Sequence, residues 1–334
     1  MGKRWRGLLC LTLVCAALAA ACGGDDDDTA SDDGGGGGGG EGQEELTEIT
    51  VGILPVADLA PLHYGIEQGF FEEEGLEVTT DIGQGGAALI PSVLSGEYQL
   101  AFGNYVSVML ARQEGVPVKI VANVVDGADT PDRGTNGLLV SPDSGIESVD
   151  DLAGRTFAVS TLDNVAEVNI RTTLRESGVD DSEIEFTELP FPEMNAAVQE
   201  GQVDVAWQAE PFVTLGEQSG LVNVADPMYG TMPSMPLAGM FASEQWLEEN
   251  PDQAEGFYRA LQRSLEASSD EQAMRDTIEA TTETPPEVVA ELALANWQPE
   301  LDREKLARIG ELATEYEILD EEPAVDDLVW TPPE

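Results

Sequence analysis

The sequence has little positive charge and few of the residues that bind metals or act as thiols. Its 334 residues contain 15 Lys and Arg against 65 Asp and Glu, with one His and three Cys, for a formal net charge of −50. A field of this sign repels nucleic acid and anionic lipid headgroups, so we expect neither as a partner. A surface tuned for solubility and a salt-rich habitat both explain the excess of acid. The composition therefore restricts the partners of the chain more than its function.

All three cysteines lie at the N-terminus, in a segment with the features of an export signal. A basic start is followed by an apolar run over residues 8–21, which ends in small residues directly before Cys22. That run is too short to span a bilayer stably, and the pattern is typical of a secretory signal. Small residues before a Cys resemble a bacterial lipobox, although an ordinary signal peptide with an incidental Cys remains an alternative. We therefore predict that residues 1–21 form a lipoprotein signal peptide and that Cys22 is acylated.

Residues 22–48 differ sharply in composition from the rest of the chain. They hold ten acids and no base, include seven consecutive glycines and contain almost no apolar side chain. Such a segment does not bury enough apolar surface to offset the entropy of ordering. We predict a disordered, acidic, Gly-rich tether that holds the folded part roughly 25–30 Å from the lipid. With Cys22 acylated, no disulfide, zinc site or thiol nucleophile remains, so stability must come from an apolar core.

From Ile49 onward, apolar segments alternate between the patterns of strands and of helices. The expected strands are 49–54, 76–82, 98–102, 118–125, 137–140, 184–189, 203–207, 221–224 and 235–241, with a short turn of helix and a further strand within 149–159. One expected helix begins near Pro61 and ends before Gly75, and a second follows 83–86 and ends at Ser95. The other expected helices cover 105–114, 164–177, 194–200, 211–219, 251–268, 271–280, 286–296 and 302–316. Several end before a Gly, as at Gly96 and Gly178, which suits a helix C-terminus. Strand–helix alternation of this kind predicts parallel sheet with right-handed crossovers.

The pattern restarts after the strand at 118–125, which predicts an α/β fold with two lobes. We expect mainly parallel sheets flanked by helices, two crossings of the chain between the lobes, and a helical C-terminal tail. Residues 49–137 and 238–334 would form lobe 1, and residues 138–237 lobe 2. Ligands of open α/β sheets bind at the carboxyl ends of the strands. Two lobes that face each other there form a cleft that hinges shut.

Several segments resemble one family of transport proteins. Ala60-Pro61-Leu62 and the run from Gly65 to Val78, GIEQGFFEEEGLEV, resemble the opening of the nitrate/sulfonate/taurine/thiamine-pyrimidine-precursor family of ABC-transporter substrate-binding proteins. Further matches follow in order at 83–96, 99–103, 149–155 and 199–212. The resemblance implies the type II periplasmic-binding-protein fold. It also implies a protein that delivers a solute to the transmembrane subunits of an ABC permease. With the anchor predicted at Cys22, we expect an extracytoplasmic, membrane-anchored monomer without a cofactor, metal or catalytic residue.

On the family's pattern, loops that follow the strands line the cleft. The candidate ligand-binding residues are therefore Asp58, Leu59, Gln84, Asn104, Tyr105, Asn136, Ser160, Thr161, Asn164, Trp207 and Glu210. Each has a structural alternative. Asn104 also suits a helix N-cap, Trp207 a buried strand, and Glu210 the positive end of a helix dipole. His63 is expected on a helix face and not in the site.

The charges on these loops bear on the identity of the ligand. Asp58, Asp163 and Glu210 lie on them, and neither Arg nor Lys does. A neutral or cationic nitrogenous solute, stacked on Tyr105 or Trp207, therefore fits better than an anion. A sulfonate or taurine-like solute remains the alternative, and Arg133 is the base that would favour it.

Two other classes of function compete with solute delivery. One relative of the fold is an enzyme that makes the thiamine pyrimidine by consuming its own His and needs iron. Here Leu59 occupies the place expected for His, and no Gly-x-Ser-x-Gly elbow, metal motif or phosphate loop is present, so we expect no enzyme. A sensory module would use the same closing cleft, and the sequence does not distinguish it from a transport protein.

Overall fold

The computed structural model describes residues 46–83, 85–130 and 134–332. The predicted signal peptide, Cys22, most of the tether, Gln84 and Arg133 lie outside the described residues. Within those ranges, no helix is both long and apolar enough to cross a membrane.

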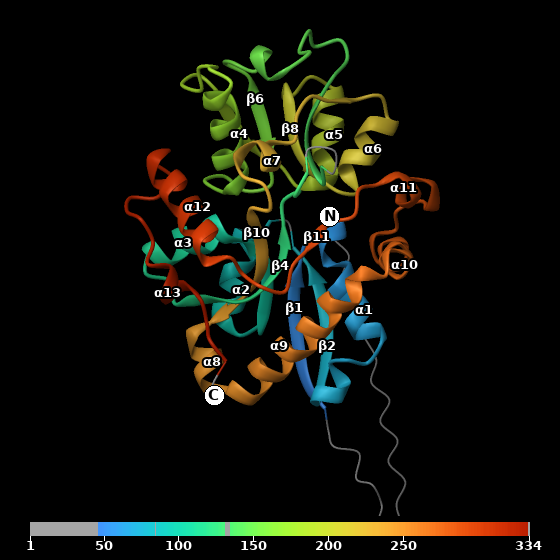
Figure 1. The fold of residues 1–334 in the computed structure, drawn as a ribbon, viewed down its shortest axis with the longest axis vertical. Helices are drawn as coiled ribbons and strands as arrows, with labels where there is room; N and C mark the ends of the chain where they lie inside the picture. The colour runs from blue at the N-terminus through green and yellow to red at the C-terminus, as the bar shows by residue number, and fades with distance from the viewer. Residues whose placement is uncertain (1–45, 84, 131–133, 333–334) are drawn as a thin grey trace, which may run out of the picture. The chain divides into compact units, whose positions relative to one another are not determined.

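Among the described residues, six strands form one sheet in the order β11-β4-β10-β3-β1-β2. Their bounds are β1 Thr47–Ile53, β2 Leu76–Ile82, β3 Leu100–Asn104, β4 Val118–Asp126, β10 Pro236–Ser243 and β11 Asn296–Trp297. β1 pairs in parallel with β2 and β3, whereas β10 is antiparallel to both β3 and β4. We call this sheet and the helices around it the six-stranded lobe (Figure 1).

A second sheet has the strand order β7-β6-β8-β5-β9. Its strands are β5 Asn136–Val140, β6 Thr156–Val159, β7 Glu185–Glu188, β8 Val205–Ala209 and β9 Val222–Asn223. β6 is parallel to β7 and β8, and β5 is antiparallel to β8 and β9. With its helices it forms the five-stranded lobe, at the top of Figure 1.

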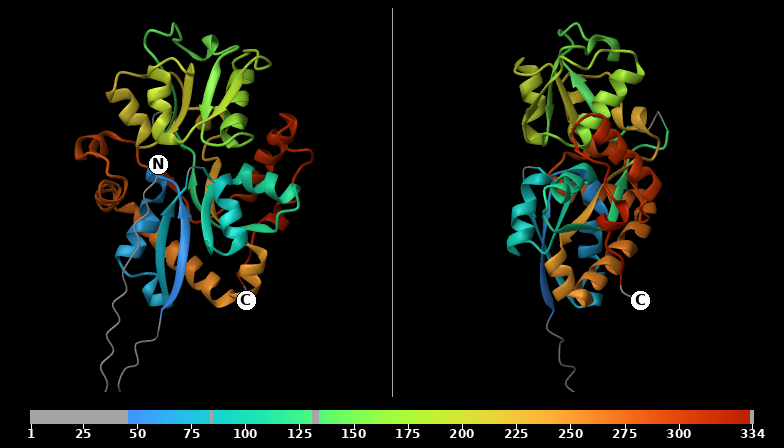
Figure 2. Two further views of the ribbon diagram at one scale, coloured as in Figure 1. Left: turned by 180° about the vertical axis from the view of Figure 1, so that it is seen from behind. Right: turned by 90° about the vertical axis from the view of Figure 1, so that its left-hand side faces the viewer.

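Helices surround both sheets, as the two views of Figure 2 show. Those of the six-stranded lobe are α1 Ala60–Glu67, α2 Ile90–Ser95, α3 Tyr105–Gln113, α8 Glu244–Glu249, α9 Pro251–Glu266, α10 Glu271–Thr282, α11 Pro286–Glu291, α12 Arg303–Glu315 and α13 Val325–Leu328. Those of the five-stranded lobe are α4 Val165–Glu176, α5 Phe191–Gln199, α6 Phe212–Gln218 and α7 Pro227–Thr231. Short 3-10 turns cover Ala57–Leu59, Glu72–Glu74, Ala87–Leu89, Val149–Asp151 and Ala267–Ser269.

The sheets are mixed, where the sequence predicted mainly parallel ones. The strands that run against their neighbours include β5 and β10, which follow the two passages of the chain between the lobes. The chain reaches each of these two strands from the other lobe. β10 therefore starts beside the end of β3, and β5 starts beside the end of β8, so each runs in the opposite direction to that neighbour. β5 begins at Asn136 and β10 at Pro236, so the two passages end just before these residues.

One expected helix is shorter than predicted. The pattern over residues 286–296 predicts a single helix, but α11 ends at Glu291, and Asn296–Trp297 is a strand. Trp297 pairs with Val125 of β4, and its indole N–H donates to the backbone oxygen of Asp58 at 2.8 Å. These contacts with residues distant in sequence override the local preference for helix.

Candidate functional site

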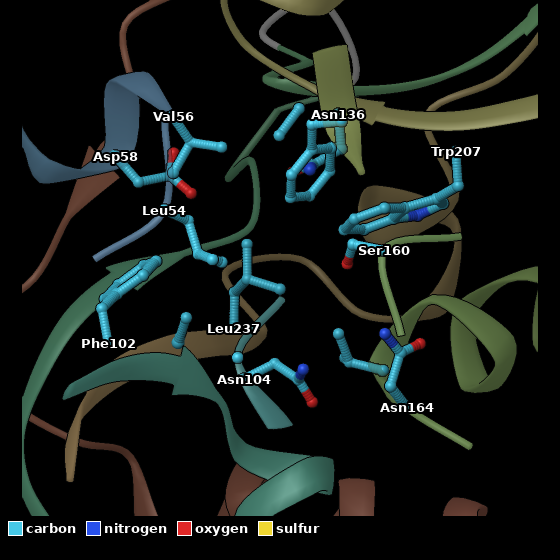
Figure 3. A pocket seen from close by; sticks show the side chains of 15 residues that line it. Leu54, Val56, Asp58, Phe102, Asn104, Asn136, Ser160, Asn164, Trp207 and Leu237 are labelled. Carbon is cyan, nitrogen blue, oxygen red and sulfur yellow. The ribbon is translucent and has the colours of Figure 1, made fainter. Parts of the chain in front are cut away.

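A cavity lies between the two lobes, where strands of both sheets end. Its volume, the space open to the centre of a water molecule, is about 40 Å³. It is lined by Leu54, Val56, Asp58, Gly86, Phe102, Asn104, Asn136, Ser160, Asn164, Val165, Phe191, Trp207, Ala209, Leu237 and Ala238 (Figure 3). This volume is far below the about 300–1,000 Å³ of typical small-molecule sites, so the lobes must part to admit a compact solute.

Most of the wall is apolar, and both lobes contribute to it. Phe102 and Leu237 come from β3 and β10 of the six-stranded lobe. Phe191 and Trp207 come from the five-stranded lobe, with their ring centroids 6.2 Å apart. Aromatic walls of this kind suit a flat or apolar solute, whose orientation a few polar groups then fix.

Trp207 presents an unused hydrogen-bond donor at this site. The side chain is only 3% exposed, and its indole nitrogen is buried without a hydrogen-bond partner among the described residues. Figure 3 shows the ring beside Ser160. A buried donor without a partner costs about 1–3 kcal/mol, so an acceptor on a bound solute would recover that energy.

Asp58 is the charged residue among those that line the cavity. It is 5% exposed, and within the described ranges no hydrogen bond reaches its carboxylate. Burial, and secondarily the negative charge of Glu210, raise the pKa of Asp58 from 3.8 to about 7. Near neutral pH the group therefore exists in both protonation states. A solute that donates a hydrogen bond or carries a positive charge would favour the ionised form.

Two asparagines combine a structural role with a place on the cavity wall. Asn104 caps α3 by accepting a hydrogen bond from the Ser107 N–H at 3.0 Å, and Asn164 caps α4 by accepting from the Ala166 N–H at 2.8 Å. Because the Asn164 oxygen is engaged in the cap, its amide nitrogen is left as a donor, and Figure 3 shows it on the side of Ser160. The cavity is therefore bordered by two helix N-termini, one from each lobe.

The structure brings six of the predicted site residues together on this wall. They are Asp58, Asn104, Asn136, Ser160, Asn164 and Trp207. Gln84 lies outside the described residues. Leu59, Tyr105, Thr161 and Glu210 are not among the residues that line the cavity, and each has other contacts.

Glu210 makes its contacts within the protein. Its side chain is 3% exposed, and its carboxylate accepts hydrogen bonds from the N–H and hydroxyl of Thr214 at 3.1 and 2.8 Å and from the Ala293 N–H at 3.3 Å. Burial raises the pKa of Glu210 to about 7. Its backbone oxygen accepts from the Ala57 N–H at 2.9 Å, which joins the two lobes. Glu210 therefore has the structural role given as its alternative in the sequence analysis, at the start of α6.

The other three residues are also held by neighbours. Leu59 is fully buried in the core, and the hydroxyl of buried Tyr105 donates to Asn123. The Thr161 hydroxyl donates to the backbone oxygen of Ser160 at 2.8 Å. A Cβ on Gly85 would lie 2.6 Å from the Thr161 hydroxyl oxygen, so these two loops meet across the interface between the lobes.

The apolar part of the wall is what sequence reasoning missed. It comprises Leu54, Val56, Gly86, Phe102, Val165, Phe191, Ala209, Leu237 and Ala238. Their positions in the sequence could have identified these residues, since most of them lie at the ends of strands or at helix starts that face the other lobe. Neither Lys nor Arg is among the described residues that line the cavity. Among the residues that the structure describes, no group of three or more His, Cys, Asp or Glu is placed to hold a metal ion.

Comparison with protein families and curated proteins gives consistent matches. A family model described as NMT1/THI5 like matches residues 56–273. The riboflavin-binding protein RibY of Chloroflexus aurantiacus is 26% identical over 229 residues, which cover 67% of this chain and 63% of RibY. The formylaminopyrimidine-binding protein of Halalkalibacterium halodurans is 24% identical over 225 residues, 66% of each chain. The chain thus spans slightly less than two thirds of the length of these relatives, and both are named as binding proteins.

A solved structure shares the fold. The ligand-binding component of an ABC-type import system from Staphylococcus aureus superposes with a TM-score of 0.74 at 17% identity, covering 85% of this chain and 97% of the other. This likeness confirms the predicted α/β periplasmic-binding-protein fold.

Proposed function

The chain belongs to the NMT1/THI5-like family, and from that premise we propose that it is the solute-binding component of an ABC import system. It captures a small organic solute between its lobes and delivers it to the transmembrane subunits of a permease. The observation that carries this proposal is the cavity between the lobes, with apolar walls and few polar groups. A binding protein, and not an enzyme, is also what the family and the names of the relatives indicate.

The solute that fits the site best is a compact, nitrogen-containing ring compound. Asp58 accepts hydrogen bonds, the Trp207 indole N–H donates one, and the aromatic side chains pack against a ring. The names of the two relatives, riboflavin-binding and formylaminopyrimidine-binding, point to solutes of the same chemistry. A sulfonate would depend on the helix starts at Asn104 and Asn164, and it would lie near the Asp58 carboxylate.

Mass spectrometry of small molecules released from the purified protein tests this proposal. We expect a nitrogenous ring compound, and re-adding it at a hundred times its dissociation constant should stabilise the protein by about 2.7 kcal/mol. Thermal unfolding with and without the compound measures that gain. Conversion of the compound to a product by the protein alone would exclude a binding protein, and recovery of a sulfonate would exclude the nitrogenous solute.

We also propose that the protein is held at the outer surface of the cell membrane by a lipid on Cys22. The support is the sequence alone, with its short apolar run, small residues before Cys22 and a Gly-rich segment after it. Cys22→Ser should leave an uncleaved precursor or release soluble protein. Cell fractionation and the mass of the processed chain measure this. Unchanged processing and membrane retention in the variant would rule out lipidation at Cys22.

A further inference from the structure

Helix α12 of the six-stranded lobe contacts helix α4 of the five-stranded lobe outside the solute cavity. The hydroxyls of Tyr316, just after α12, and Thr172 of α4 are hydrogen-bonded at 2.9 Å. The guanidinium of Arg175 lies over the Tyr316 ring at 4.4 Å from its centroid, and it also pairs with Glu315 at 3.3 Å. Figures 1 and 2 show α12, in red, beside α4. We call Tyr316, Thr172 and Arg175 the Tyr316 contact.

The parts of the Tyr316 contact differ in expected strength. The Arg175–Glu315 pair is exposed, with 41% and 56% of the two side chains accessible, so it contributes little. Thr172 is only 4% exposed, and its hydroxyl also donates to the Val168 backbone oxygen. The Nε–H of Arg175 donates to both carboxylate oxygens of Asp181 at 3.0 Å, which fixes the guanidinium over the Tyr316 ring. The Tyr316 side chain therefore provides most of the interaction with the five-stranded lobe at this point.

The same two helices lead to the cavity wall. α4 is capped by Asn164, which lines the cavity, and Thr172 lies two turns further along the same helix. α12 packs on α3, where a Cβ on Gly310 would lie 3.7 Å from the sulfur of Met109. α3 in turn is capped by Asn104, which lines the cavity from the six-stranded lobe. The Tyr316 contact thus connects α4, through α12, to α3, and the capping residues of α3 and α4 both line the cavity.

We propose that the Tyr316 contact holds the lobes closed and so sets solute affinity from outside the cavity. A binding site that is formed only part of the time has an affinity reduced by that fraction. Any change that favours the open state therefore weakens binding without a change in the wall of the cavity. The proposal rests on the proposed function, in which the lobes close around a solute, but its test needs no solute and can fail independently.

Hydrogen exchange at the Ala57 amide measures opening directly. This N–H donates to the Glu210 backbone oxygen at 2.9 Å across the lobes, so it exchanges when they part. Tyr316→Phe removes one hydroxyl hydrogen bond and should speed Ala57 exchange roughly threefold to tenfold. Tyr316→Ala also removes the ring under Arg175 and should speed it more than tenfold. Amides within β1 and β8, which lie inside the separate lobes, should exchange at unchanged rates.

Arg303→Gln provides the matched control. Arg303 lies on α12 and pairs with Asp326 of α13 at 2.8 Å, within the six-stranded lobe, so its loss should leave Ala57 exchange unchanged. Selective acceleration at Ala57 in the Tyr316 variants supports the proposal. Unchanged exchange at Ala57 in both variants would overturn it. Equal acceleration in β1, β8 and Ala57 would also overturn it, because the contact would then stabilise the whole fold and not the closed state.

Discussion

Asp58→Asn is expected to stabilise the solute-free protein at pH 8 and at the same time weaken solute binding. The pKa of Asp58 is raised from 3.8 to about 7, mainly by burial, so the unfolded chain releases this proton at a lower pH than the folded chain. The stability that the protonated group contributes is present in full below pH 3.8 and is lost as the pH rises through about 7. The loss is on the order of 4 kcal/mol. Asn has no charge to bury, so the variant avoids most of this loss.

Binding should change in the opposite direction. In the complex proposed above, the ionised Asp58 would accept a charge-assisted hydrogen bond from a nitrogenous solute, worth about 1.5–3 kcal/mol, so Asp58→Asn should weaken binding roughly tenfold to a hundredfold. The affinity of the unaltered protein should fall up to about tenfold per unit as the pH drops below 7, because the solute must then displace a proton. In the variant this pH dependence should disappear.

Denaturant unfolding between pH 5 and 9 and calorimetry with the recovered solute measure the two effects. Asp143→Asn is the control, because it removes the same charge from an exposed position of a turn and should alter neither quantity. Tighter binding in the Asp58→Asn variant would show that the cavity prefers an anion. Lower stability of that variant at pH 8 would show that the carboxylate has a stabilising partner.

Gly239→Ala should be the most destabilising single-methyl change in β10. A Cβ at this position would lie 2.1 Å from the backbone oxygen of Ala122 and 2.5 Å from the hydroxyl of Tyr105. The first is a main-chain atom of β4 that the sheet holds in place, so the strands must separate to admit the methyl group. Overpacking of this kind costs about 1–3 kcal/mol of stability. Because the clash here is with a backbone atom, we expect a cost at or above the upper end of that range.

Gly256→Ala is the matched control for this prediction. Gly256 is buried in the interior of α9, but the atom nearest to an added Cβ is 3.4 Å away, an ordinary contact. Ala favours a helix interior over Gly by about 0.8–1.0 kcal/mol, so this variant should gain stability. The free energies of unfolding of the two variants should therefore change in opposite directions. Similar values for both would contradict the clash at Gly239.

The fold could be predicted well from local signals that depend on few residues. β2 has the predicted bounds, and Gly96 and Gly178 have φ angles of +77° and +75° at the ends of helices where the sequence placed them. Helix α7 was missed although Asp226 before Pro227 is a strong start signal, and the Asp226 carboxylate does accept from the Met228 and Tyr229 N–H groups. The segment has only five residues, too few to show a helical period.

The site was harder to predict because sequence does not show which way a side chain points. Glu210 follows a strand next to the cavity, but its carboxylate is directed to Thr214, four residues ahead, which offers two donors. Phe102 and Leu237 are indistinguishable in sequence from core residues, and only the meeting of the lobes makes them a wall. The side-chain positions of polar residues at helix starts, such as Asn164, were predictable. The side-chain oxygen of Asn164 accepts a backbone N–H of the helix, and this hydrogen bond fixes the position of the amide group.

The position of β10 between β3 and β4 also determines the order in which the chain can fold. These two strands are near in sequence, but they are joined only through Pro236–Ser243, more than a hundred residues later. The five-stranded lobe lies between β4 and β10 in the chain. All its strands have been synthesised by Asn223, before β10 is made. Until β10 arrives, β3 and β4 carry unpaired backbone edges, which are prone to pair with other chains. A nascent chain therefore needs protection from aggregation until about residue 243 has been made.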